Sequence, residues 1–232
     1  MTESNSCPSL AELTLEADPS AWRAAGFEVG DDGSAWVGAV RLRLAGPEAT
    51  GRRIVGWALR DLQSTELDGL PTQRHEHPSV DRPGTHPNGA ERIDHVVAFS
   101  PDLERTITAL RAAGLDFRRL REGPTPAGAQ RQALARSADG SAIRRAPQQA
   151  FFRVGEAILE VVEHPPGTPL AEDPDAPAGF YGLALATADI DATARVLGPL
   201  LGEVRDAVQP GRRIATVRRE AALGLPVAFM SL

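Results

Sequence analysis

After residue 91, the spacing of hydrophobic and polar residues changes from that of a β-strand to that of an α-helix. Residues 93–99 form a short apolar run, partly of β-branched residues, which predicts a β-strand. Ser100 and Pro101 then suit the N-cap and first position of a helix. Apolar residues recur at helical spacing as far as Gly114, where we expect the helix to end before another strand.

The same pattern returns in residues 179–202. Thr187 follows Gly182 by five residues, as Ser100 follows His95. Acidic residues and a helical apolar stripe come next in both segments, and each segment is later followed by a glycine turn and an apolar strand. Self-similarity over a whole supersecondary unit predicts two modules that pack as a pair.

A weaker copy of the unit precedes these two. The sequence therefore predicts four parts, which are a degenerate N-terminal βαβββ-like module (10–62), an irregular linker or loop (63–90), a first module (91–164) and a second module (179–232). The second part is rich in Pro, Gly, His and Asn and is too long for an ordinary connection.

Composition narrows the function classes. The chain has 232 residues, 42% hydrophobic and 24% charged, which is typical of a soluble globular protein with a real core. It contains no lysine, which excludes Schiff-base chemistry and a P-loop. A net charge of -6 and only 5% aromatic residues argue against a nucleic-acid partner.

We expect a cytoplasmic protein without a membrane partner. No apolar run approaches the roughly 18–20 residues that span a bilayer, and the first ten residues do not resemble a signal peptide. The single Cys7 cannot form an internal disulfide, which is compatible with a reducing compartment.

The order of strand, capped helix and three further strands resembles the vicinal oxygen chelate superfamily, also called the glyoxalase/bleomycin-resistance/dioxygenase group. The resemblance lies in four stretches, which are Ile93–Val97, Ser100–Leu103, Phe152–Gly155 and Leu159–Val162. It implies an α+β fold of repeated βαβββ modules, with a half-open mixed β-sheet cup, helices outside, and a small-molecule ligand.

The resemblance also implies where a metal would bind. Superfamily metalloenzymes take ligands from the first and last strands of both modules, which here gives His95 and Glu160 in the first module. The second module offers Gly182 and Phe229 at the matching positions. A divalent cation needs four to six ligands. A bound metal ion (Zn, Fe, Mn or Ni) and the absence of any cofactor are therefore equally compatible with the sequence.

Two functions remain open, with the catalytic residues unassigned. One is a metal-dependent lyase, isomerase or dioxygenase acting on a small oxygenated substrate. The alternative is a metal-free small-molecule binding or resistance protein, favoured by Gly182 and Phe229 because they open space and add apolar lining. A cup filled by side chains would instead indicate an interaction module.

Several residues outside the metal positions are candidates for ligand contacts. Arg153 lies on a strand expected to line the cup, and residues 116–147 hold seven arginines and three acids. Such a run is either a solvated basic face or a site for an anionic ligand. His86 and Asn88 could reach the ligand from a loop, although Asn88 with Gly89 first suggests a turn. Unpaired strand edges favour a homodimer.

Overall fold

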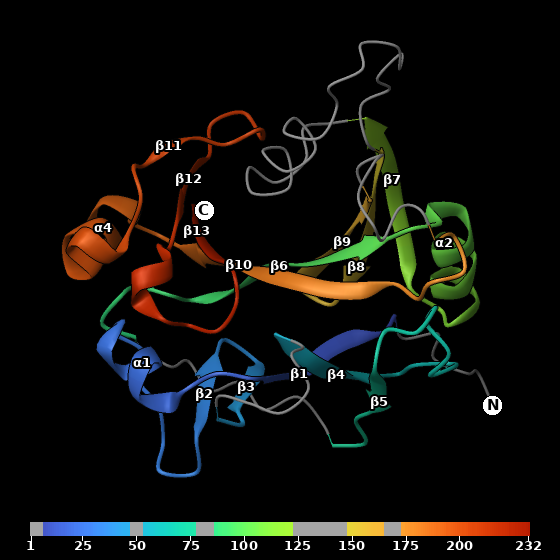
Figure 1. Cartoon of the computed structure of the whole chain (residues 1–232), viewed down its shortest axis with the longest axis horizontal. Helices are drawn as coiled ribbons and strands as arrows, with labels where there is room; N and C mark the ends of the chain where they lie inside the picture. Colours follow the sequence, from blue (N-terminus) through green and yellow to red (C-terminus); the bar gives the residue numbers. More distant parts are fainter. Residues whose placement is uncertain (1–6, 47–52, 78–85, 123–147, 165–172) are drawn as a thin grey trace.

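A computed structural model describes residues 7–46, 53–77, 86–122, 148–164 and 173–232. Two β-sheets lie one above the other and share an apolar core, with helices near their ends (Figure 1). Within the described segments, no helix is both long enough and apolar enough to cross a membrane.

The larger sheet has eight strands in two βαβββ modules. The first module comprises β6 (Arg92–Ser100), α2 (Leu103–Ala112), β7 (Asp116–Glu122), β8 (Gln148–Val154) and β9 (Ala157–Glu163). The second comprises β10 (Gly179–Thr187), α4 (Ile190–Leu197), β11 (Arg205–Asp206), β12 (Arg213–Thr216) and β13 (Val227–Ser231), with 3-10 turns η1 (Gly198–Leu200) and η2 (Arg219–Ala221).

The two modules join through their first strands. The strand order is β11-β12-β13-β10-β6-β9-β8-β7, and the central pair β6 and β10 is antiparallel (Figure 1, green and orange). Each module's last strand runs parallel to its first, β9 beside β6 and β13 beside β10. The predicted α+β fold of paired βαβββ modules is confirmed.

Both modules contain a corresponding pair of buried hydroxyl groups. The hydroxyl oxygens of Ser100 and Thr106 lie 2.6 Å apart, and those of Thr187 and Thr193 at the corresponding positions lie 3.0 Å apart.

The prediction of Ser100 as the N-cap of the first module's helix is wrong. The chain stays extended through Ser100, so the helix begins later. Its cap is Asp102, whose side chain accepts a hydrogen bond from a backbone N–H in the first turn.

The smaller sheet belongs to the N-terminal part. Its elements are β1 (Ser9–Leu15), α1 (Pro19–Ala24), β2 (Ser34–Val37), β3 (Val40–Leu44), β4 (Ile54–Arg60) and β5 (Thr72–Arg74), and its strand order is β2-β3-β1-β4-β5. Strand β5 falls inside the segment predicted as a linker and pairs in parallel with β4. The order and relative directions reproduce those of β12-β13-β10-β6-β9.

Large side chains fill the space between the sheets. Phe27, which follows α1, stacks on Phe229 of β13 with ring centroids 6.3 Å apart, and Trp57 of β4 meets Phe180 of β10 edge-on at 5.2 Å. The indole N–H of Trp22 donates to the carbonyl of Leu223. Because burying one such side chain contributes roughly 1.5–3 kcal/mol, these contacts fix the N-terminal sheet against the larger one.

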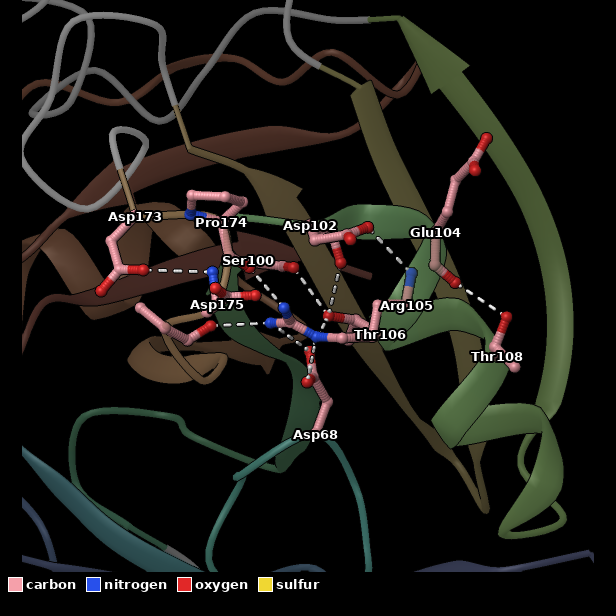
Figure 2. A network of polar contacts seen from close by, with 11 residues as sticks. Asp68, Ser100, Asp102, Glu104, Arg105, Thr106, Thr108, Asp173, Pro174 and Asp175 are labelled. Atoms are coloured by element: carbon pink, nitrogen blue, oxygen red, sulfur yellow. Dashed lines mark hydrogen bonds and ion pairs between the residues drawn. The ribbon is translucent and has the colours of Figure 1, made fainter.

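A polar network ties three distant segments together at the start of α2 (Figure 2). The buried carboxylate of Asp68 lies 2.6 Å from Nε of Arg105 and also accepts a hydrogen bond from the hydroxyl of Thr106. The same guanidinium donates to the carbonyls of Pro174 and Ala176, ahead of β10. One ion pair thus joins the N-terminal part, the first module and the connection to the second.

We expect Asp68→Ala to lower the free energy of unfolding by about 1–3 kcal/mol, because the Arg105 guanidinium loses its carboxylate partner. Urea denaturation measures this change. Arg195→Ala is the matched control, since Arg195 forms a largely exposed pair with Asp189 and its loss should cost no more than about 0.5 kcal/mol. Equal losses in the two variants would show that the network does not hold the segments together.

Candidate functional site

The face of the larger sheet turned away from the N-terminal sheet lines a cavity of about 910 Å³. Two adjacent rows of strand-register partners cross its floor. The first row consists of Arg153, Ile158, His95, Ala184, Ala228 and Thr216. The second consists of Arg119, Phe151, Glu160, Val97 and Gly182. Strand pairing therefore brings residues far apart in sequence to one surface.

A chain of charged and polar groups lies at the centre of this floor. Nδ1 of His95 lies 2.8 Å from a carboxylate oxygen of Asp94, and Nε2 lies 3.6 Å from Glu160. The other carboxylate oxygen of Asp94 is 2.5 Å from Arg212, which also donates to the carbonyl of Ser231. The imidazole is thus held between two carboxylates, with Asp94 fixing the ring through Nδ1.

Asp94 was not predicted as a site residue because strict alternation would point it away from His95. The structure has an irregularity in the β6–β10 pairing at this point. His95 pairs with Ala184 and Ile93 pairs with Leu185, so Asp94 is an extra residue without its own register partner. Such a bulge re-aims a side chain, and both Asp94 and His95 consequently line the cavity.

The carboxyl of Asp94 stays ionised although it is buried. Burial by itself raises its pKa, but hydrogen bonds from His95 and Arg212 and the charge of the guanidinium outweigh that effect. The net result is a pKa of about 2, below the ordinary 3.8. Asp94 is therefore a permanent anion at neutral pH and a fixed acceptor for His95.

The second module does not supply the other half of a metal site. Strand pairing makes Gly182 the counterpart of His95, as expected, but a Cβ there would lie 2.5 Å from the carbonyl oxygen of Pro226. No donor side chain fits at that position without a backbone shift. Ala228, the counterpart of Glu160, carries no donor atom. Among the residues that the structure describes, no group of three or more His, Cys, Asp or Glu could hold a metal ion.

Phe229 was predicted at the wrong place in the register. Leu159 pairs with Val96 as Val227 pairs with Leu183, which aligns Glu160 with Ala228. A shift of one residue moves a side chain to the other face of a sheet. Phe229 accordingly points into the core between the sheets, fully buried, and does not line the cavity.

His86 and Asn88 also lie outside the cavity lining. His86 accepts a hydrogen bond from the backbone N–H of Glu28 and donates to the carbonyl of Trp36, and burial lowers its pKa. Asn88 is fully buried and bonds the carbonyl of Ala25 and the N–H of Ala90. His86 thus contacts β2 and Asn88 contacts the end of α1, so both side chains hold the segment before β6 against the N-terminal part and are structural.

Arginine dominates the charged lining. The structure places Arg153 in the wall, on the strand expected to carry it. The described lining contains seven arginines and four acids, so the cavity carries an excess of positive charge in a chain of negative net charge. These are Arg92, Arg118, Arg119, Arg121, Arg153, Arg205 and Arg212, with Asp94, Glu156, Glu160 and Asp206.

Acid titration should reveal the ion pairs of Asp94. Since its folded pKa of about 2 lies below the ordinary 3.8, its stabilisation is complete above pH 3.8 and is lost as the pH falls towards 2. The stability difference between the natural chain and Asp94→Asn, on the order of 2 kcal/mol at neutral pH, should therefore shrink below about pH 4 in urea denaturation. A difference independent of pH would contradict this assignment.

No protein-family model matches the chain, and no curated protein is detectably similar in sequence. Among solved structures, methylmalonyl-CoA epimerase from Mycobacterium tuberculosis is 18% identical, with a TM-score of 0.43 over 62% of this chain and 89% of that one. A hypothetical protein, BH1468, from Bacillus halodurans C-125 is 14% identical, with a TM-score of 0.42 over 61% and 94% of the two chains. The strand order and module repeat of the chain itself show the paired βαβββ fold that the sequence predicted.

Proposed function

We propose that this protein binds a small organic molecule in the cavity of the larger sheet, without a resident metal ion. The observation that carries the proposal is the pair Gly182 and Ala228. These residues are the second-module counterparts of His95 and Glu160, and they remove two of four potential donors.

The dimensions and lining of the cavity support a ligand of ordinary metabolite size. A volume of about 910 Å³ lies within the range of small-molecule pockets. Apolar side chains of the floor, such as Val97, Ile158, Ala184 and Met230, lie among the charged groups around His95. A binding site for an organic molecule usually combines apolar surface with polar groups that fix the orientation of the ligand.

A second candidate function, acid–base catalysis on the bound molecule, rests on the arrangement around His95. Asp94 holds Nδ1, so that Nε2 faces the cavity beside Glu160. An imidazole oriented in this way can accept a proton from a bound molecule and return it, which is the chemistry of an isomerase or a lyase. Turnover, unlike binding, would then be abolished in His95→Gln.

Metal analysis tests the proposed function directly. Protein purified without a polyhistidine tag should contain no stoichiometric Zn, Fe, Mn or Ni, and titration with these ions should show no tight site, because His95 and Glu160 supply only two donors. Elemental analysis by mass spectrometry gives the occupancy. A stoichiometric ion that disappears in His95→Ala would refute the metal-free proposal.

Ligand binding can be tested with a neutral apolar probe, 2-naphthamide, by isothermal titration calorimetry. Binding should be lost in Ala228→Phe, because the new ring would occupy the floor of the cavity. The matched control is Ala188→Phe, since Ala188 is an exposed residue between β10 and α4 and does not line the cavity. Equal binding by both variants would place the probe elsewhere on the protein.

A further inference from the structure

We propose that the wall formed by β7 and β8 recognises the anionic group of an organic ligand, a carboxylate or phosphate attached to an apolar body. This inference rests on the proposed function, because it concerns the same cavity. It adds the chemical class of the ligand and the direction in which the ligand lies.

Two guanidinium groups are held over a single aromatic ring in this wall. Arg119 and Arg121 occupy alternate positions of β7, and their Cζ atoms lie 4.9 and 5.0 Å from the ring centroid of Phe151. Arg121 also donates from Nε and Nη2 to the side-chain oxygen of Gln149. Cation–π contact and hydrogen bonds therefore restrict both side chains before any ligand binds.

The positive charge of this wall is only partly neutralised. Across the described part of the chain, neither Arg119 nor Arg153 has a carboxylate within ion-pair distance. The guanidinium of Arg212, at the opposite side of the floor, is instead engaged by Asp94. Among the described lining residues, Arg92 and Arg205 also lack a carboxylate partner, but they lie apart on β6 and β11. Arg119, Arg121 and Arg153 instead lie together on the adjacent strands β7 and β8, and their guanidinium groups match carboxylate and phosphate in geometry.

The register rows determine how such a ligand would lie. From Arg153 the first row continues through Ile158 to His95, and from Arg119 the second continues through Phe151 to Glu160. An anionic group at the arginines therefore has apolar surface beside it. The carboxylate of Glu160 repels a second anion from the centre of the floor, so the uncharged body of the ligand extends towards His95.

An organic anion fits these contacts better than an inorganic one. A free phosphate would use the arginines but would leave the apolar side chains of Val97 and Ile158 uncovered. A ligand that carries both parts gains the charged hydrogen bonds together with apolar burial. The expected ligand is accordingly a small carboxylate or phosphate ester with an apolar portion.

The test compares 2-naphthoate with 2-naphthamide, which has the same apolar body and no charge, by isothermal titration calorimetry on the full chain. We expect 2-naphthoate to bind roughly tenfold or more tightly than the amide, and the advantage to fall as salt is added. Arg119→Gln and Arg153→Gln should each remove most of that advantage without changing binding of the amide.

Arg195→Gln is the control, since it removes one positive charge from the exposed surface of α4, outside the cavity. Equal affinity for the two probes, or an advantage of 2-naphthoate that persists in both cavity variants, would overturn the anion proposal and leave cavity binding intact. Failure of both probes to bind would overturn the proposed function as well. Inorganic phosphate that binds as tightly as 2-naphthoate would overturn the need for an apolar body.

Discussion

The contact between the N-terminal sheet and the central strands β6 and β10 is the constraint on which the rest of the structure depends. Both strands expose one face to the cavity and bury the other, so their apolar residues need a cover. Ile93, Val96 and Leu185 are almost fully buried in the core shared with the N-terminal sheet. This cover lets the opposite face carry His95 and small residues, because the strands are already stabilised from behind.

The fold could be predicted because its signals are local and repeated. A change from strand to helix period, an acidic residue before the helix and a glycine after it occur in both modules, and the two predictions support each other. Features that depend on contacts between distant segments could not be predicted from the local sequence. Ser100 resembled a helix cap in the sequence, but its hydroxyl bonds that of Thr106. The short strand β5 is recognised as a strand by its pairing with β4.

The site could be predicted only where alternation is regular. Arg153 and Glu160 line the cavity as their strand positions suggested. Asp94 escapes that rule because a bulge turns it beside His95, and Phe229 was misplaced because the closing strands align one residue differently from the sequence repeat. Arg212 lies outside both repeated motifs, and only the pairing of β12 with β13 brings it to Asp94.

The two sheets share one spatial order of strands, but the two halves of that order follow each other in the opposite sequence along the chain. In the larger sheet the strands β6 and β9 precede β10, β13 and β12, whereas in the smaller sheet their counterparts β4 and β5 come after β1, β3 and β2. The halves are therefore related as in a circular permutation. The same edge-to-edge pairing of a three-strand unit with a two-strand unit is compatible with either chain order and with different connecting segments.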